Sequence, residues 1–168
     1  MRRGIGSLVL VGLISPGATA AGGVDDARVA VGRVLDDFHA AAAAADETRY
    51  FAHFTPDAVF LGTAPAERWT LEQFRAYARP HFAAGRGWSY VATERHVVRA
   101  DDGRLAWFDE TLRSEKYGVL RGTGVLRRTT AGWKIAQYSM TFLVPNELAA
   151  EVVALIRGGG AESAGDEP

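Results

Sequence analysis

The chain of 168 residues has no cysteine, almost no net charge and only one apolar run long enough to suggest targeting. Without cysteine there is no disulfide framework and no thiolate metal ligand, which suits a protein that is indifferent to the redox state of its compartment. The formal net charge is −1 and no block of like charge occurs. We therefore expect neither a nucleic acid nor an acidic membrane as a partner.

Motifs for metals, nucleotides and serine hydrolysis are missing as well. There is no H-E-x-x-H, and the four histidines are scattered at positions 39, 53, 81 and 96, so we expect no metal. Gly122-Thr123-Gly124 lacks a third glycine at the right distance and opens no predicted helix, so it is not a nucleotide loop. No G-x-S-x-G occurs. We expect no cofactor.

The one apolar run, residues 5–14, follows the basic residues 1–3 and precedes Ala18-Thr19-Ala20. A basic start, a short apolar stretch and an A-x-A site are typical of a signal peptide, which we assign to residues 1–20. The alternative, a buried N-terminal helix, is disfavoured because glycines interrupt the run. We expect a periplasmic or secreted protein with no membrane contact after cleavage.

The remaining chain, with 48% hydrophobic residues overall, predicts one domain over residues 24–157 and a disordered tail over 158–168. A first helix begins near Asp25 or Asp26 and ends in the alanine run 40–45, whose small side chains permit close approach of another element. Thr70 begins a capping box for a third helix. Further helices are predicted over residues 47–54 and 147–157, and strands over 58–61, 88–99, 105–113, 119–128 and 133–143.

Helices followed by a long antiparallel meander predict an α+β fold, in which the helices cover one face of a strongly curved antiparallel sheet that forms a cone. Gly122 and Gly124 fall on the same face of one strand. Glycines at such positions either permit the sheet to bend or leave space for something that approaches the backbone, and the sequence leaves both open. His39, His53 and the acidic pairs at 36–37 and 101–102 are interpreted as solvated helix and turn residues.

Four segments resemble a known family: residues 50–60 (YFAHFTPDAVF), 106–110 (AWFDE), 121–128 (RGTGVLRR) and 132–136 (GWKIA). With the order of elements, they are similar to the nuclear transport factor 2 superfamily and, within it, the SnoaL-like proteins, over residues 26–144. The resemblance implies a cystatin-like α+β barrel. It does not imply one activity, because the superfamily includes isomerases, hydratases, epoxide hydrolases, polyketide cyclases and non-catalytic binding domains.

Ketosteroid isomerase, a member of that superfamily, uses a carboxylate base with a tyrosine and a protonated acid. When the two sequences are aligned through residues 56–59 without gaps, its tyrosine falls at Phe38, its base at Gly62 and its second acid at or beside Gly124. Steroid isomerisation by that mechanism is therefore not expected. A His and Asp pair of the dehydratase kind is not evident either.

The register implied by the resemblance turns Trp107, Asp109, Thr111 and Arg113 into the cone. A shift by one residue would exchange Asp109 for Glu110, and both stay candidate catalytic bases. The alternative is that Asp109 and Arg113 form an exposed pair. The expected ligand-binding residues, several of which are equally natural as core or helix-end residues, are Phe38, Tyr77, His81, Trp88, Tyr90, Trp107, Thr111, Arg113, Gln137 and Ser139.

Three functions remain open. The first is an exported domain that binds a small, partly apolar molecule in the cone. The second is a cofactor-free acid–base enzyme of the isomerase, hydratase or cyclase type, with Asp109 or Glu110 as base and Tyr77, Tyr90 or Tyr138 as donor. The third is a protein-interaction module with a filled cone. A homodimer through the convex sheet face, which carries Arg121, is expected from the family pattern.

Overall fold

The computed structural model describes residues 20–162, with side chains from residue 26 to residue 158. The expected signal peptide and the last residues of the expected tail lie outside the described side chains. The helices are α1 (Ala20–Ala43), α2 (Glu47–Ala52), α3 (Leu71–Ala83), the short 3-10 helix η1 (Asn146–Leu148) and α4 (Ala149–Glu162). The strands are β1 (Phe54–Leu61), β2 (Arg68–Thr70), β3 (Val91–Arg99), β4 (Leu105–Ser114), β5 (Gly118–Thr129) and β6 (Gly132–Phe142).

The strands form one sheet of six in the order β2-β1-β6-β5-β4-β3. All neighbours are antiparallel except β1 and β6, which are parallel, with Phe60 opposite Tyr138. The expectation of a purely antiparallel sheet was wrong at this point. The meander from β3 to β6 is antiparallel as predicted. After β1 the chain forms the edge strand β2 and then α3, and β6 later lies beside β1 in the same direction.

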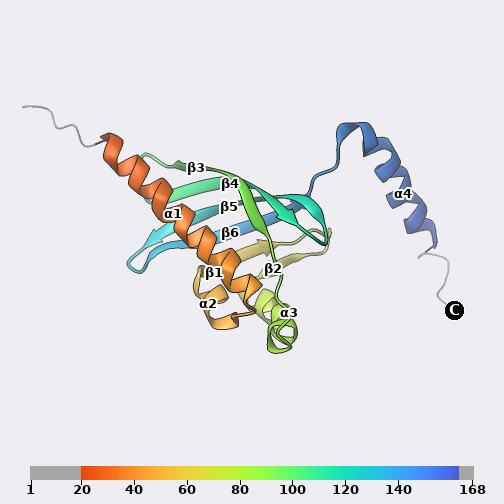
Figure 1. The fold of residues 1–168 in the computed structure, drawn as a ribbon, viewed down its shortest axis with the longest axis horizontal. Coiled ribbons are helices and arrows are strands. Elements are labelled where there is room, and N and C mark those ends of the chain that lie inside the picture. Colours follow the sequence, from red (N-terminus) through yellow and green to blue (C-terminus); the bar gives the residue numbers. More distant parts are fainter. Residues whose placement is uncertain (1–19, 163–168) are drawn as a thin grey trace, which may run out of the picture.

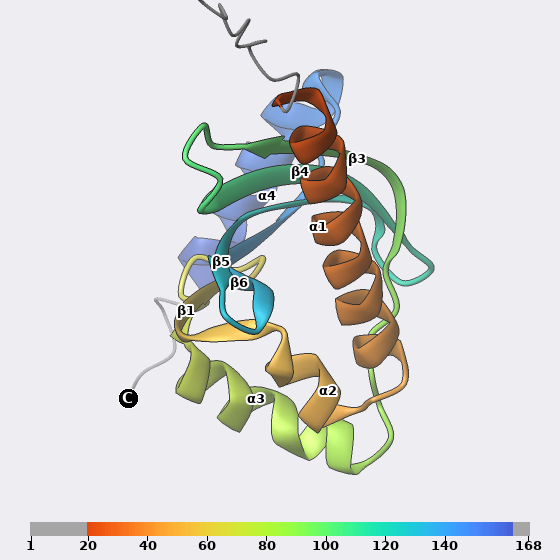
Figure 2. The same ribbon diagram turned by 90° about the vertical axis from the view of Figure 1, so that its left-hand side faces the viewer.

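The sheet is strongly curved but not closed, since β2 and β3 are its two free edges. α1 crosses the concave face diagonally (Figure 1), and α3 lies below the β1 end of the sheet (Figure 2). The α+β class and the cone-like curvature were predicted correctly. α4 extends away from this body (Figure 1) and runs on to Glu162, into the segment expected to be a tail.

The helices form where the apolar spacing and the caps predicted them. On α1, Val31, Leu35 and Phe38 are buried against the sheet, at the spacing of one helix face. At the start of α3 the Thr70 hydroxyl accepts from the backbone N–H of Gln73, and the Gln73 side chain accepts from the N–H of Thr70. This reciprocal cap satisfies two backbone donors and fixes where α3 begins.

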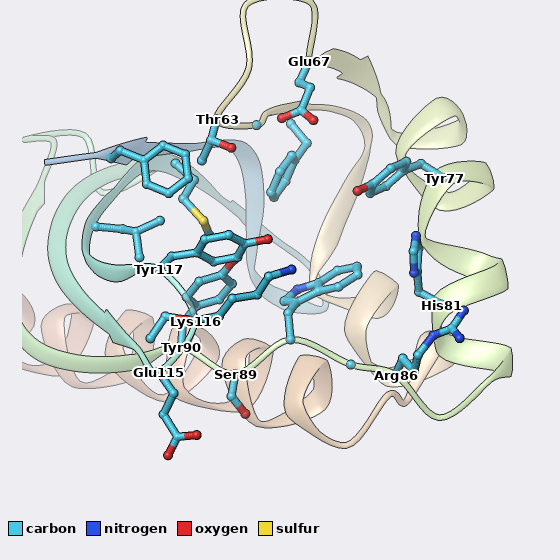
Figure 3. A pocket seen from close by; sticks show the side chains of 18 of the residues that line it. Thr63, Glu67, Tyr77, His81, Arg86, Ser89, Tyr90, Glu115, Lys116 and Tyr117 are labelled. Atoms are coloured by element: carbon cyan, nitrogen blue, oxygen red, sulfur yellow. The ribbon is translucent and has the colours of Figure 1, made fainter. Parts of the chain in front are cut away.

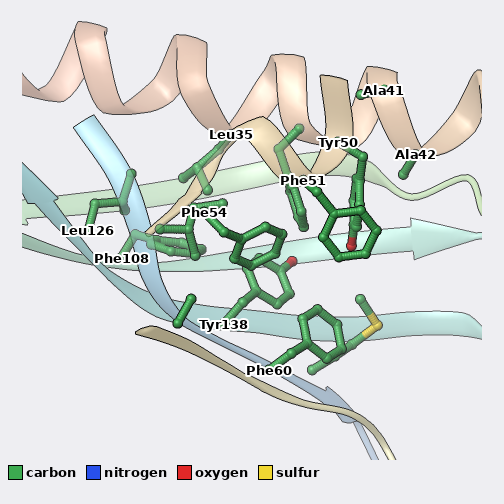
Figure 4. Packing of buried hydrophobic residues seen from close by; sticks show 14 of the residues in the cluster. Leu35, Ala41, Ala42, Tyr50, Phe51, Phe54, Phe60, Phe108, Leu126 and Tyr138 are labelled. Atoms are coloured by element: carbon green, nitrogen blue, oxygen red, sulfur yellow. The ribbon is translucent and has the colours of Figure 1, made fainter. Parts of the chain in front are cut away.

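Aromatic rings fill the inner end of the concave side (Figure 4). Phe60 and Phe74 stack with ring centroids 3.8 Å apart, and Phe38 stacks on Tyr50 at 4.6 Å. Ring pairs at such distances add to the stabilisation from burial alone. The narrow end of the cone is therefore packed core.

The predicted strand over residues 88–99 begins later, at Val91. Residues 86–90 instead form an irregular segment that passes the end of α1. A Cβ on Gly87 would collide with the carbonyl oxygen of Ala42, so the backbones touch there. Ala41 and Ala42 are fully buried at this contact, as the alanine run suggested. This segment carries Trp88 and Tyr90 over the open end of the sheet.

Candidate functional site

A cavity of about 910 Å³ opens at the mouth of the cone. Its walls come from α3, from the β1–β2 connection, from residues 86–91 and from the turn between β4 and β5, while Leu120, Met140 and Phe142 belong to the sheet side. Figure 3 shows Tyr77 and His81 of α3 on one side, facing Tyr90, Lys116 and Tyr117 on the other. The volume falls within the range of small-molecule sites.

Aromatic rings supply much of the apolar wall. Trp69 stacks on Tyr77 with ring centroids 4.8 Å apart, and Trp88 stacks on Phe82 at 4.7 Å. Burial, with smaller effects of Tyr117 and Tyr77, raises the pKa of Tyr90 to about 12. Tyr90 is therefore a neutral hydrogen-bond donor at neutral pH. Such a wall suits a flat or ring-bearing molecule.

Some of the expected ligand-binding residues come together at this cavity and others do not. Tyr77, His81, Trp88, Tyr90 and Arg113 line it. Phe38 does not, because it is 2% exposed and packed within the ring cluster of the core.

The register expected for the last strands was wrong by one residue. On β4 the buried side chains are those of Ala106, Phe108, Glu110 and Leu112, so the intervening residues face outward. On β6 an irregularity in the pairing opposite Val125 and Leu126 brings Tyr138 and Met140 inward. The residues that consequently lie on the outer face are Trp107, Asp109, Thr111, Gln137 and Ser139. Arg113 is on the same outward side of β4 but lines the cavity because it lies near the end of the strand.

Glu110, rather than Asp109, points inward and is 1% exposed. Its Oε1 accepts hydrogen bonds from Nε2 of His39 at 2.8 Å and from the Tyr138 hydroxyl at 2.9 Å. Its Oε2 accepts from Nε of Arg95 at 2.7 Å. Arg95 in turn donates to Asp36 Oδ1 at 2.7 Å and to the carbonyl of Gly32 at 3.2 Å. These hydrogen bonds connect α1 with β3, β4 and β6 of the sheet.

The electrostatics of this cluster keep Glu110 ionised. Burial alone would raise the pKa of Glu110. The hydrogen bond and charge of His39, followed by the charge of Arg95, lower it by more than burial raises it, so the net pKa lies below the ordinary value. Burial also raises the pKa of Tyr138 well above normal, and the neighbouring Glu110 charge raises it further. A low-pKa carboxylate with three donors around it is a weak base. Glu110 also does not line the large cavity.

His39 was interpreted from the sequence as a solvated helix residue, and this was wrong. The side chain is buried between α1 and β4, where it donates to Glu110. Beside it lies a smaller hollow of about 330 Å³ between α1 and residues 89–92. Glu110 shares its strand face with Ala106, Phe108 and Leu112, and an acid among apolar residues on one face was the available signal that it needs partners.

Gly122 and Gly124 lie on the inner face, as predicted, but neither lines the cavity. A Cβ on Gly122 would overlap the Tyr138 hydroxyl and come within 3.0 Å of Glu110. A Cβ on Gly124 would overlap the carbonyl of Gln137 and the Phe108 ring. The two glycines therefore admit close approach by the protein's own atoms, the side chains of Tyr138, Glu110 and Phe108 and the backbone carbonyl of Gln137.

Several lining residues were missed by sequence reasoning, chiefly Trp69, Arg86, Lys116 and Tyr117. Lys116 and Tyr117 sit in the turn between β4 and β5, and a hairpin turn is normally solvated. Nothing in the sequence of the turn indicates that its side chains line the cavity. No group of three or more metal-binding side chains occurs among the described residues. None of the described helices combines the length and apolar character needed to cross a bilayer.

The comparisons with known proteins agree with this architecture. The model of the SnoaL-like domain matches residues 31–145. An NTF2-like protein of unknown function from Pseudomonas putida superposes with a TM-score of 0.62 at 17% identity, covering 73% of this chain and 91% of that one. An NTF2-like protein with a cystatin-like fold from Novosphingobium aromaticivorans superposes with a TM-score of 0.56 at 16% identity, covering 75% of this chain and 88% of that one.

A protein from Streptomyces avermitilis, provisionally described as a dehydratase of the NTF2-like family, superposes with a TM-score of 0.58 at 19% identity, covering 72% of this chain and 99% of that one. No curated protein matches this chain in sequence. At these identities the structural likeness shows the fold alone, whereas the domain model covers more than half of the chain. The chain belongs to the SnoaL-like domain family and has its NTF2-like, cystatin-like α+β fold.

Proposed function

We propose that this protein binds one small, partly apolar, ring-bearing molecule in the cavity at the mouth of the cone. The observation that carries the proposal is the cavity of about 910 Å³ walled by Trp69, Tyr77, Trp88 and Tyr90. An open cavity on a packed aromatic core is a common arrangement for a small-molecule site, because flat rings gain contact area there with little loss of side-chain freedom. Membership of the SnoaL-like family is compatible with ligand binding and with catalysis alike.

Binding is favoured over acid–base catalysis because the inward carboxylate is already engaged. Glu110 has three hydrogen-bond donors and lies outside the cavity lining. The other candidate base, Asp109, is exposed on the outer face. A base has to reach the proton that it removes, either directly or through one water.

Ligand binding is tested by screening flat aromatic and alicyclic compounds for a rise in melting temperature and by titrating the hits. Tyr90→Ala, which removes a cavity wall without removing a ring stack, should weaken binding by about tenfold or more. Trp107→Ala removes a ring that is 48% exposed on the outer face and should leave the affinity unchanged. Equal losses in both variants, or no hit at all, would contradict the proposal.

Export is part of the same proposal, on the strength of the basic residues 1–3, the apolar residues 5–14 and the Ala18-Thr19-Ala20 site. Expression of the full chain in a bacterial host, followed by mass spectrometry of the periplasmic fraction, tests it. The expected product begins at Ala21. An uncleaved chain found only in the cytoplasm would refute export without affecting the ligand proposal.

A second candidate property is pairing of two copies through the outer face of the sheet. Val98, Leu105, Trp107 and Val119 are each at least 40% exposed there. Polar residues surround these apolar ones on the same face. Asp109 on β4 is paired with His96 on β3 and with Thr123 on β5. Arg121, also on β5, is paired with Thr111 on β4. An apolar centre with an acid on β4, Asp109, and a base on β5, Arg121, can pair with a copy of itself related by a two-fold axis.

A further inference from the structure

We infer that the ligand is an organic anion, a ring-bearing carboxylic acid whose carboxylate binds beside Lys116 and the hydroxyl groups of Tyr77 and Tyr90. This inference rests on the proposed function, since it names the ligand class of the same cavity. It is carried by the placement of polar and charged groups around the cavity.

The polar atoms at the cavity mouth converge from opposite walls. In Figure 3 the Lys116 amine points into the cavity from the β4–β5 turn, and the Tyr77 hydroxyl points inward from α3. Lys116 Nζ lies 4.8 Å from the centre of the Tyr117 ring. Among the described residues, the hydroxyls of Tyr77 and Tyr90 have no hydrogen-bond partner that would occupy them. They are therefore available as donors to a ligand oxygen.

The residues that line the cavity carry a small excess of positive charge, three cations against two carboxylates. Arg86, Arg113 and Lys116 all line it, and none of the three forms an ion pair within the described chain. The acidic lining residues are Glu67 and Glu115. Glu67 accepts a hydrogen bond from the backbone N–H of Ala64, which holds its side chain in its own turn and leaves its charge in place. Figure 3 shows the Glu115 carboxylate directed away from the cavity.

An anion fits this arrangement better than a cation or a neutral molecule. A carboxylate that enters an apolar cavity loses hydration, and a cation with hydroxyl donors at the same place replaces it. A cationic ligand would find an aromatic cage, but the Lys116 ammonium already lies against one of its rings and would repel a second positive charge. A neutral ligand would gain nothing from the charge of Lys116.

The test uses three probes of one shape: 2-naphthoate, naphthalene-2-carboxamide and (2-naphthyl)trimethylammonium, each titrated calorimetrically at pH 7 and low salt. The acid should bind more tightly than the amide by about fivefold. Lys116→Gln should reduce the affinity for the acid to about that for the amide and leave the amide unchanged. Lys134→Gln, the same substitution at a lysine outside the cavity, should change neither affinity.

The possible failures are distinguishable. If the probes bind but the amide or the ammonium compound binds as tightly as the acid, or if Lys116→Gln affects acid and amide equally, the inference of an anion is overturned and the proposed function stands. If none of the three probes binds, both are overturned. Weakening of the acid by raised salt in the native chain, but not in Lys116→Gln, would add support.

Discussion

Tyr138 on β6 and Glu110 on β4 are hydrogen bonded over the strand that separates them. The Tyr138 hydroxyl donates to Glu110 Oε1 at 2.9 Å, and β5 lies between their two strands. The hydrogen bond passes over Gly122 of β5, which is paired with Glu110 on one side and with Met140 on the other. A glycine at this point leaves the space that the bond occupies, so the hydrogen bond and the glycine depend on each other.

Gly122→Ala should destabilise the protein by about 1–3 kcal/mol, because the new methyl group overlaps the Tyr138 hydroxyl and presses on Glu110 in a packed core. Denaturant unfolding measures the change. The cost should shrink in a Tyr138→Phe background, where the overlapping oxygen is absent. Strict additivity of the two substitutions would contradict this account.

Gly32→Ala is the matched control and should act in the opposite direction. Gly32 lies within α1, and a Cβ there would come no nearer than 3.9 Å to Arg95 Nη1, which is an ordinary contact. Alanine stabilises a helix interior by about 0.5–1 kcal/mol relative to glycine. A loss of stability in this variant would show that the space around Arg95 is tighter than the structure indicates.

Glu110→Gln should cost about 3 kcal/mol in the free energy of unfolding, because Arg95 and His39 then lose a buried anionic partner. The matched control is the neighbouring Asp109→Asn, which removes a charge from the exposed face and should stay within about 0.5 kcal/mol of the native chain. Comparable losses in the two variants would mean that the buried cluster contributes nothing beyond an exposed charge.

The same cluster predicts a pH dependence of stability. The folded pKa of Glu110 is lower than its ordinary value of 4.5, so its contribution is fully present above pH 4.5 and is lost as the pH falls through the folded pKa. His39, Arg95 and Tyr138 are the groups that face the carboxylate. The difference in unfolding free energy between the native chain and Glu110→Gln should therefore shrink as the pH falls below 4.5. A constant difference down to pH 3 would contradict the lowered pKa.

The helices and the meander were predictable because each depends on short-range signals. Apolar spacing identified the buried face of α1, and the reciprocal cap at Thr70 and Gln73 fixed the start of α3. β2 was not predicted, since a strand as short as Arg68–Thr70 has no periodicity of its own. The parallel pairing of β1 with β6 depends on how distant segments meet, about which the sequence of either strand says nothing.

The candidate site was predicted only in part, because register decides which side chains face inward. Alternation on β4 is ambiguous, since Trp107 reads as a buried residue and Glu110 as a solvated one, while the structure has them the other way round. The partners that make a buried glutamate tolerable, His39 and Arg95, are far from it in sequence. Trp88 and Tyr90 were predicted from their alternation on an opening strand, whereas the structure places them in the irregular segment before β3, where they line the cavity.

Phe74→Ala should destabilise the domain by about 3–5 kcal/mol, since the ring is 2% exposed and stacks on Phe60 and Trp69. Tyr77→Ala, one turn further along α3 and 47% exposed, serves as the matched control, with an expected loss below about 1 kcal/mol. Urea midpoints measure both. Similar midpoints for the two variants would show that the ring stack between α3 and the sheet is not part of the stabilising core.

Trp107→Glu should convert a dimer into a monomer if two copies pair through the outer face. The residue is 48% exposed and lies between Val98 and Val125 in the sheet register, at the centre of the apolar patch. A charge there would be buried without a partner in the paired state, which is strongly unfavourable. Tyr77→Glu puts the same charge on a similarly exposed ring at the cavity mouth and should leave the dimer intact. Sedimentation equilibrium at micromolar concentration distinguishes the two states, and a native chain that sediments as a monomer would refute the pairing, while the cavity and its ligand would be unaffected.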